Sequence, residues 1–499
     1  MKKSILVKAI SSAVLIATLG SSMSYAAERE PNLGMSPLME HMYNGNFPSQ
    51  AEAQKLADEL YYQRAVHAYM TMLPALNVIG MRDGSEEVFG EGYNVLPIWK
   101  DRMDSNAWVP TPNADVIYAM SYLDLKETGP LVVAAPAGVI GMFTDFFQRT
   151  LTDVGPSGPD KGKGGLYLLT PPGYDGFIPD GYYVYESSTY NVFLFFRMLM
   201  TQGEDGPDTS RGVAFAEKTS VYPLWDEEKN IKQMEFPNAS EKRLNMMYPT
   251  DTTYWTKLKA FVDYEPIEAI DLETRGVLAS IGIIKGKPFE PTASQQEMLE
   301  KAVDIAPKMI LSKRMLGRKD KRNLYYHDRQ YERIWAGGTS EWMQESYLDL
   351  DQRSAFFQFG YSSAPAMVVR AIDNGSKYPV TPRDSEGNLL SGENTYKMHL
   401  PAGIPAKLFW AVTAYNVTDG TMTATDQVLP SHNSFEDTVI NEDGSIDMYF
   451  GPEKPDGVAD TNFIKTVPGR NFLGALRLFG TSGEFFTQSW KPDDLVKIK

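Results

Sequence analysis

The sequence predicts a mainly β protein with helical segments, and two observations indicate this fold class. Short aromatic and β-branched runs punctuated by Gly and Pro fill residues 96–225 and return after residue 350, a pattern typical of the strands of a β-sandwich. Before the first of these regions and between the two, apolar residues recur at three- and four-residue spacing, which predicts amphipathic helices.

Residues 1–26 form the first element and are expected to be a secretory signal peptide. The opening MKKSILVKAISSAVLIATLGSSMSYAAERE has a lysine-bearing start, an apolar run and a small-residue break at Ala26 and Ala27. A retained N-terminal anchor is the alternative, but the run is short and serine-rich for a membrane span. No later segment has about 18 uninterrupted apolar residues, so we expect a periplasmic or secreted protein with no membrane span in the mature chain.

After the leader, the alternation of patterns predicts four segments. No low-complexity linker or internal repeat separates them, so we expect the domains to pack against one another. The predicted segments are an N-terminal helical segment at 27–95, a β-sandwich at 96–225, a second helical segment at 226–350 and a C-terminal β domain at 351–499.

The predicted helices carry their own stop signals. The first is expected over residues 49–81, because Pro74 and then Gly80 and Gly84 interrupt its apolar periodicity. In the second helical segment, Pro307 predicts a break or a kink.

Composition excludes several classes of function. The 499-residue chain has a formal net charge of −16, which disfavours nucleic acid or an anionic membrane surface as the main partner because both repel it. The same surplus of acid is also ordinary for a soluble protein. There is no cysteine, so disulfides and thiolate chemistry are excluded. A homo-oligomer is compatible with the sequence.

Several stretches resemble two bacterial families of unknown function. TPNADVIYAMSYLDL, GPLVVAAPAGVIGMFTDFFQRTLTDVGPSGPDKGKGGLYLLTPPGY and PDGYYVYESSTYNVFLFFR resemble the family numbered 1254. GNLLSGENTYKMHLPAGIPAKLFWAVTAYN, NEDGSIDMYFGP and TVPGRNFLGALRLFG resemble its usual C-terminal companion, numbered 1214. The resemblance implies an immunoglobulin-like β-sandwich, a helical middle segment and a C-terminal jelly roll. It implies no reaction.

Common catalytic and cofactor signatures are missing. The sequence has no G-x-S-x-G elbow and no H-E-x-x-H helix. GPSGPDKGKGG, residues 155–165, has the wrong spacing for a phosphate-binding loop and is interpreted as a glycine-rich surface loop. No cofactor is therefore expected.

We also expect no zinc, iron or heme site. None of the five histidines pairs with another at ligand spacing. NEDGSID, residues 441–447, alternates oxygen-bearing side chains as calcium loops do, but a tight hairpin turn explains it as well and the distal glutamate is missing. The histidines are His41, His67, His327, His399 and His432, of which His432 is the one expected to face a solvent cleft.

A polar pair, Asn113 and Asp115, stands where an apolar strand begins. Both faces of the strand are largely apolar, so it is expected to be covered on both sides. A buried carboxylate must be paired, and Arg149 or Arg477 is the expected partner of Asp115. In a continuous strand, Asp145 and Arg149 would lie about 13 Å apart and could not pair with each other.

Two interpretations of these residues stay open. The first is a structural ion pair that holds two domains together. The second is a ligand cleft in which Trp410 and Tyr415 supply apolar walls. Its remaining predicted members are Asn113, Asp115, Tyr118, Asp145, Arg149 and Arg477.

The function predicted from this cleft is a cofactor-independent hydrolase acting on a small or glycan-like extracellular substrate. Asp115 or Asp145 would be the general acid or base, since carboxylates can do this work without nucleotide cofactors. Arg149 and Arg477 would bind anionic groups or stabilise developing negative charge. The alternative is a non-catalytic module of the cell envelope that binds a carbohydrate or another small ligand. A purely structural envelope protein is a third hypothesis.

The leader generates the first testable prediction. Protein recovered from the periplasm or the medium should begin within a few residues of Ala27, because the charged start, apolar run and small-residue break occur in order. N-terminal sequencing measures this directly. Retention of Met1 on most molecules would contradict it.

Overall fold

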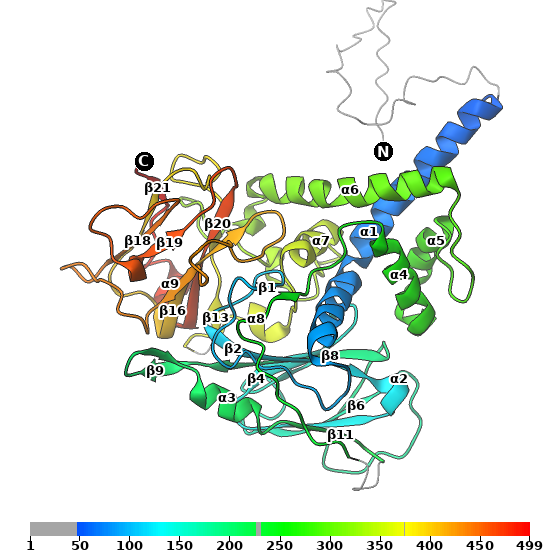
Figure 1. Cartoon of the computed structure of the whole chain (residues 1–499), viewed down its shortest axis with the longest axis horizontal. Coiled ribbons are helices and arrows are strands. Elements are labelled where there is room, and N and C mark those ends of the chain that lie inside the picture. Colours follow the sequence, from blue (N-terminus) through cyan, green and yellow to red (C-terminus); the bar gives the residue numbers. More distant parts are fainter. Residues whose placement is uncertain (1–46, 226–230, 374) are drawn as a thin grey trace, which may run out of the picture. The chain divides into compact units, whose positions relative to one another are not determined.

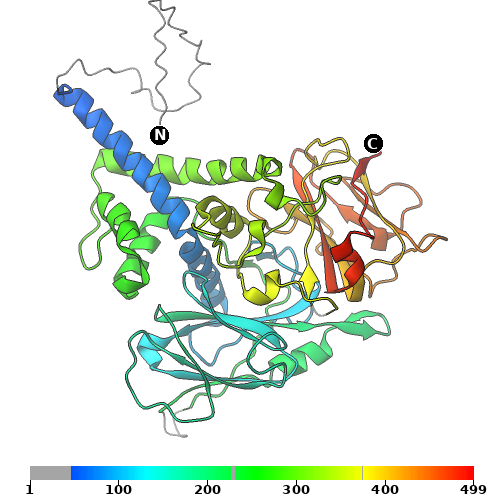
Figure 2. The ribbon, with the colours of Figure 1, turned by 180° about the vertical axis from the view of Figure 1, so that it is seen from behind.

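Residues 47–225, 231–373 and 375–499 are described by a computed structural model (Figures 1 and 2). The predicted signal peptide lies outside these residues. The described residues from Leu60 onward form one compact unit, and all sites discussed below belong to it. The predicted class, a β-rich chain with helical segments and sandwich-type sheets, is confirmed.

The first β region consists of two sheets with a shared core. One sheet has the strand order β2-β8-β4-β5 and the other β11-β3-β6-β7, and every neighbouring pair is antiparallel except β6 and β7. Ile117, Phe143, Tyr167 and Phe196 lie in the core between them. The strands are β2 (Val116–Asp124), β3 (Leu131–Ala135), β4 (Ile140–Asp145), β5 (Thr150–Val154), β6 (Gly165–Thr170), β7 (Tyr183–Glu186), β8 (Asn191–Leu199) and β11 (Ser220–Pro223).

Strand β2 is buried on both faces, as its sequence predicts. Ile117 and Ala119 point into the sandwich core. Tyr118, Met120 and Tyr122 point the other way, into a larger core shared with the helices. The sheet that contains β2 is therefore a middle layer, and side chains from both its faces are available to build sites.

The helices supply the other side of that larger core. Tyr69 of α1 stacks on Tyr254 of α4, and α6 packs beside α7. The helices are α1 (Gln50–Phe89), α2 (Leu125–Thr128), α3 (Ser210–Ala216), α4 (Thr253–Tyr264), α5 (Leu272–Ser280), α6 (Ala293–Met315), α7 (Leu350–Phe359), α8 (Pro365–Val368) and α9 (Gly483–Thr487). Short 3-10 turns occupy Ile267–Ala269, Gly317–Lys319, Lys321–Asn323, Ala336–Gly338 and Asp460–Asn462.

The predicted end of the first helix is wrong, because α1 continues through Pro74 to Phe89. A proline lacks the N–H that would bond to the carbonyl four residues earlier. Here the Met70 carbonyl accepts a hydrogen bond from the Ser354 hydroxyl at 3.1 Å instead. Helix α6 likewise runs through Pro307 without interruption. Both helices therefore accommodate an internal proline, and at Pro74 a tertiary partner contacts the carbonyl that the proline leaves free.

The two glycines after Pro74 are packing positions rather than helix ends. The end of β12 (Leu244–Asn245) crosses α1 so closely that a Cβ at Gly84 would lie 1.9 Å from the Asn245 carbonyl oxygen. A Cβ at Gly80 would lie 2.3 Å from the Met247 carbonyl oxygen. Only glycine permits this approach of two backbones.

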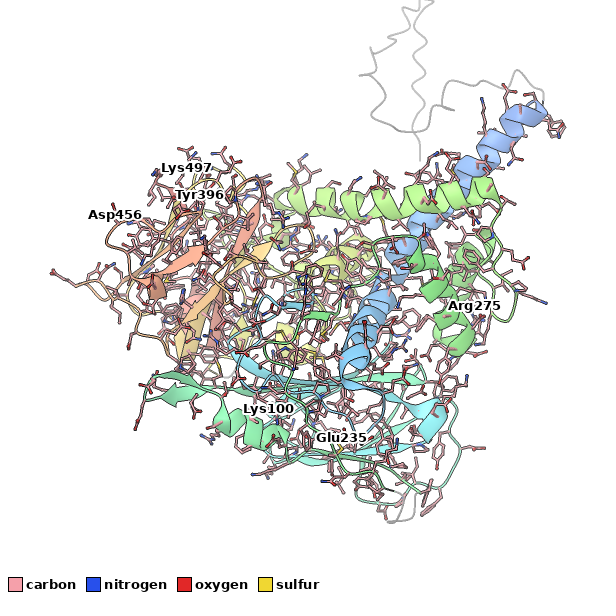
Figure 3. All side chains as sticks on the ribbon, viewed as in Figure 1. Lys100, Glu235, Arg275, Tyr396, Asp456 and Lys497 are labelled. Carbon is pink, nitrogen blue, oxygen red and sulfur yellow. The ribbon has the colours of Figure 1, made fainter. Side chains whose placement is uncertain are left out.

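The C-terminal region contains a second pair of sheets. One has the order β13-β20-β16-β17, with β14 also paired to β20, and the other β19-β18-β15-β21. Tyr396 packs in the core between them, whereas Lys497, its partner across the sheet, is exposed (Figure 3). The strands are β13 (Ser376–Lys377), β14 (Val380–Thr381), β15 (Tyr396–Leu400), β16 (Ala406–Asn416), β17 (Ser431–Asn433), β18 (Ile446–Gly451), β19 (Phe463–Lys465), β20 (Phe472–Thr481) and β21 (Val496–Lys497).

Two short pairings complete the fold. Strand β1 (Ala107–Trp108) pairs in parallel with β12, and β9 (Thr201–Gly203) forms a hairpin with β10 (Gly206–Asp208). Among the described residues, no helix is both long enough and apolar enough to cross a membrane.

The close approach at Gly84 generates a stability prediction. Gly84→Ala should lower the free energy of unfolding by about 1–3 kcal/mol, because the new methyl group overlaps backbone atoms that cannot rotate away. Gly276→Ala is the matched control, since it lies in α5 with no atom within 4 Å of the added Cβ. That control should gain up to about 1 kcal/mol from helix propensity. Equal denaturation midpoints for the two variants would contradict the packing.

Candidate functional site

Asp115 is a fully buried carboxylate at the start of β2. Its Oδ1 accepts hydrogen bonds from Arg102 at 3.0 Å and from the Asn433 amide at 2.9 Å, and its Oδ2 accepts one from the Ser431 hydroxyl at 2.9 Å. Asn113 Oδ1 accepts from the Asp115 backbone N–H at 2.9 Å, which fixes the turn. Asp115 thus connects the first sandwich to β17 of the second.

The predicted partner of Asp115 is corrected by this arrangement. Its ion pair is with Arg102, not with Arg149 or Arg477. Arg102 also pairs with Glu436 at 2.9 Å, and Glu436 in turn contacts His432. Arg477 acts on Asp115 only through its charge, because its guanidinium is held by hydroxyls on β16.

The prediction that Asp145 and Arg149 lie too far apart to pair is wrong. Asp145 is the last residue of β4, and the chain turns back at Gln148, whose φ is +56°. The Arg149 Nε therefore lies 2.6 Å from Asp145 Oδ2. The Ser188 hydroxyl donates to the same oxygen, and the backbone N–H groups of Phe147 and Arg149 donate to the other.

The structure does not bring the two predicted acid/base residues together. Asp145 lies opposite Val192 of β8, and Val116, next to Asp115, lies opposite Leu199. Seven residues along a strand span about 23 Å. Carboxylate pairs that cleave glycosidic bonds lie about 5–10 Å apart. Asp115 and Asp145 therefore belong to different environments.

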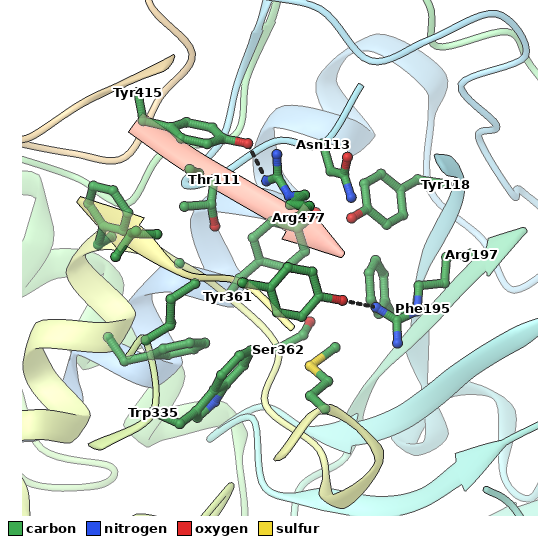
Figure 4. A pocket seen from close by; sticks show the side chains of 18 of the residues that line it. Thr111, Asn113, Tyr118, Phe195, Arg197, Trp335, Tyr361, Ser362, Tyr415 and Arg477 are labelled. Carbon is green, nitrogen blue, oxygen red and sulfur yellow. Dashed lines mark hydrogen bonds between the residues drawn. The ribbon is translucent and has the colours of Figure 1, made fainter. Parts of the chain in front are cut away.

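A cavity beside Asp115 does collect part of the predicted set (Figure 4). The space open to the centres of water-sized molecules is about 80 Å³. Asn113, Tyr118, Tyr415 and Arg477 line it, whereas Asp115, Asp145 and Arg149 do not. Trp410 also does not, because it points into the core of the second sandwich, on the face of β16 opposite Tyr415. The lining residues that sequence reasoning missed include Thr111, Phe195, Arg197, Arg314, Trp335, Phe356, Tyr361, Ser362 and Tyr378.

Among the residues that the structure describes, three arginines and no carboxylate line the cavity. Arg477 is 6% exposed and donates to the Thr413 hydroxyl at 2.7 Å and to the Tyr415 hydroxyl. Arg197 makes one long hydrogen bond, 3.4 Å, to the Tyr378 hydroxyl. The third, Arg314, lies 3.9 Å from the centre of the Phe359 ring. Guanidinium groups stay charged in proteins, so the lining is cationic.

The carboxylates that act on these arginines are not part of the lining. Asp115 acts on Arg477, Asp153 on Arg197 and Glu332 on Arg314. Burial raises the pKa of Tyr118 to about 12 despite the opposing effect of Arg197 and Arg477. The phenol is therefore neutral near pH 7 and does not cancel the positive charge.

Two buried hydroxyls at the cavity have no partner among the described residues. They are those of Tyr361, 8% exposed, and Ser362, 1% exposed. Ser362 and Thr111, both labelled in Figure 4, have left-handed backbone conformations, with φ of +59° and +44°. Such conformations are costly for residues other than glycine and are concentrated at functional sites. The cavity has unused donors as well as unused positive charge.

Comparison with known families identifies both β regions. Residues 93–223 match the model of a family described as a protein of unknown function, DUF1254, and residues 375–483 match that of a second one, DUF1214. The two predicted families are therefore present, in the predicted order.

Two solved structures have a similar chain. The VPA0106 protein from Vibrio parahaemolyticus aligns with a TM-score of 0.51 and 17% identity, covering 88% of this chain and 100% of that one. An uncharacterized protein from Burkholderia cenocepacia aligns with a TM-score of 0.39 and 11% identity, covering 91% of each chain. A comparison with curated proteins finds no match. The first likeness supports the fold alone.

The Asp115 contacts generate the next prediction. Asp115→Asn should lower the free energy of unfolding by about 1–3 kcal/mol, because Arg102 keeps only Glu436 as its counter-charge and the new N–H₂ group faces other donors in a buried position. Chemical denaturation measures the change. Asp175→Asn, at an exposed position of the same domain, should stay within about 0.5 kcal/mol of the parent. Similar losses in both variants would contradict the role of Asp115.

Proposed function

We propose that this protein, which carries a DUF1254 domain followed by a DUF1214 domain, binds a small organic anion, a short-chain carboxylate, in the arginine-lined cavity. The observation that supports this is a lining with three guanidinium groups and no carboxylate. Guanidinium groups match carboxylates with two parallel hydrogen bonds, and a desolvated site strengthens them. The leader predicts that binding takes place in the periplasm or the medium.

The size of the cavity favours a ligand of few atoms. Its volume, about 80 Å³, is roughly half that of a 150 Å³ cavity known to hold benzene. A sugar ring is larger than benzene, so the glycan ligand considered from the sequence fits poorly. The remaining walls are apolar, with Ile334, Met367, Val380 and Ala475 among them. An acid with a short alkyl chain would bury that chain against these residues.

Hydrolysis has weaker support than binding. The predicted acid and base would lie about 23 Å apart, and no histidine, aspartate or glutamate lines the cavity. Ser362 has a free hydroxyl, but no base lies among the lining residues to activate it. Turnover of short-chain esters that disappears in Arg197→Met would favour the hydrolase.

Titration calorimetry with propionate at low salt tests the binding proposal. Arg197→Met should weaken binding by about tenfold or more, because the ligand loses a hydrogen bond to a charged guanidinium. Methionine keeps the apolar part of the arginine side chain, so the packing around it is preserved. Arg470→Met, an exposed position, is the matched control and should bind as the parent does. Choline, a cation of similar size, should not bind. No heat with propionate, phosphate or sulfate, or equal affinity in Arg197→Met, would refute the proposal.

A further inference from the structure

A second cleft, with about 940 Å³ open to water-sized molecules, lies where the C-terminal half of α1 meets the end of β2, helix α2 and helix α4. It shares no lining residue with the arginine-lined cavity. Its charge is opposite, since acidic residues outnumber basic ones two to one. The acidic members are Asp83, Glu86, Glu91, Asp124, Glu127 and Glu265, and the basic ones are Arg82, Lys232 and Lys257.

Three of the other carboxylates in the cleft, those of Asp83, Asp124 and Glu265, are already engaged in ion pairs or hydrogen bonds. Asp83 pairs with Arg82 at 2.9 Å and with Lys257. Asp124 caps α2 by accepting from its first backbone N–H groups. Glu265 accepts hydrogen bonds from the backbone N–H groups of Tyr190 and Asn191 and from the side-chain amide of Asn191.

Glu86 differs from these residues. Its ion pair is with Arg82 Nε at 3.7 Å, beyond hydrogen-bond distance. Arg82 is also hydrogen-bonded to Asp83, through Nε at 3.1 Å and Nη2 at 2.9 Å. Glu86 is therefore an under-compensated negative charge on the wall of the cleft.

The Tyr122 hydroxyl is a second, independent indication of a ligand site. Tyr122 is 7% exposed, lines the cleft, and its hydroxyl has no hydrogen-bond partner among the described residues. Its ring is held by stacking on Phe193, with centroids 5.2 Å apart. The charges that act on the hydroxyl are those of Glu86, Arg82 and Asp83, so it points toward α1. A ligand at Glu86 would be within reach of this oxygen.

The pKa values of two carboxyl groups in the cleft agree with a cation site. Burial raises the pKa of Glu86 to about 7, with a further contribution from Glu91, Asp83 and Asp124 that Arg82 only partly opposes. Burial likewise raises the pKa of Glu265 to about 7, and Asp124 adds to it, although hydrogen bonds from Asn191 and Tyr190 oppose the rise. A bound cation would favour the ionised form of both.

The other titratable groups that line the cleft come from every neighbouring element and contribute to the same balance of charge. They are Arg82 and Asp83 on α1, Glu91 and Tyr93 after it, Tyr122 and Asp124 on β2, Glu127 on α2, Lys232 in the loop before β12, and Lys257, Tyr264 and Glu265 on and after α4.

The geometry suits an organic ammonium better than a metal ion. Among the described residues, no three Asp, Glu, His or Cys side chains converge as metal ligands do. The cleft instead has aromatic walls in Tyr93, Phe261 and Tyr264. Two of these rings already contact lysines of the chain, since Lys126 Nζ lies 4.0 Å from the centroid of Tyr264 and Lys232 Nζ lies 5.6 Å from that of Tyr93. Carboxylates combined with aromatic faces are the usual receptors of ammonium groups.

We propose that this cleft binds a linear aliphatic amine, with one ammonium group between the Glu86 carboxylate and the Tyr122 hydroxyl. The ammonium donates hydrogen bonds to both oxygens, which satisfies the unpaired hydroxyl and neutralises the under-compensated carboxylate. A second ammonium further along the chain meets the carboxylates of Glu91 and Glu127 on the outer part of the cleft. The site is separate from the anion cavity and does not depend on its function.

Titration calorimetry with 1,4-diaminobutane, at low salt and pH 8, tests this site on the full mature protein. Glu86→Gln should weaken binding by about tenfold or more, and Tyr122→Phe, which removes only the hydroxyl, by a few-fold. Glu87→Gln is the matched control, because it removes the same charge from the neighbouring exposed position outside the lining. It should bind the diamine as the parent does.

The pH dependence supplies a second readout. Affinity should fall several-fold from pH 8 to pH 6 in the parent, because the carboxyl groups protonate near pH 7, and should fall less in Glu86→Gln. Absence of diamine binding to the parent, equal binding to Glu86→Gln and Glu87→Gln in folded protein, or calcium binding that the diamine does not displace would each overturn the proposal. Thermal melts establish that each variant is folded.

Discussion

The contact on which this structure depends most is the buried carboxylate of Asp115 with its donors. An ionised carboxylate without water is tolerated only when it is paired and fully hydrogen-bonded. The donors come from Arg102, more than ten residues before it, and from Ser431 and Asn433, more than three hundred residues after it. Any fold that buries Asp115 must therefore bring β17 against the start of β2.

The arginine-lined cavity is a consequence of that junction. The turn before Asp115 is held against the second sandwich, where the Tyr415 hydroxyl donates to the Pro112 carbonyl at 2.5 Å. Asn113 and Tyr118 on one side then lie near Tyr415 and Arg477 on the other (Figure 4). The carboxylates that would neutralise the arginines belong to the layer behind the lining, which leaves the charge available to a ligand.

One face of β2 serves both proposed sites. Tyr118 lines the cationic cavity and Tyr122, four residues further on, lines the acidic cleft. Residues four apart on a strand point the same way and lie about 13 Å apart. The helical layer covers this face between them, with Met120 buried in the shared core. Two pockets of opposite charge can coexist at this separation because a packed apolar layer divides them.

The sequence by itself determined the class of fold and several local features. Its alternating apolar runs predicted the β regions and the doubly covered β2, and its motifs identified both families. It also identified Asn113, Tyr118, Tyr415 and Arg477 as candidate site residues, because polar or charged groups within apolar segments must be hydrogen-bonded or paired. Arg197, in the apolar run FLFFRMLM, carries the same signal and could have been found by it.

Only the tertiary structure decided which of these residues meet. Arg102 replaced Arg477 as the partner of Asp115, a tight turn brought Arg149 to Asp145, and Pro74 stayed inside a helix whose Met70 carbonyl lies 3.1 Å from the Ser354 hydroxyl. The unpaired hydroxyls of Tyr361, Ser362 and Tyr122 have no sequence signature at all. Periodicity records which face of an element is buried, but pairing and its absence depend on segments hundreds of residues away, whose positions follow from the packing of the whole chain.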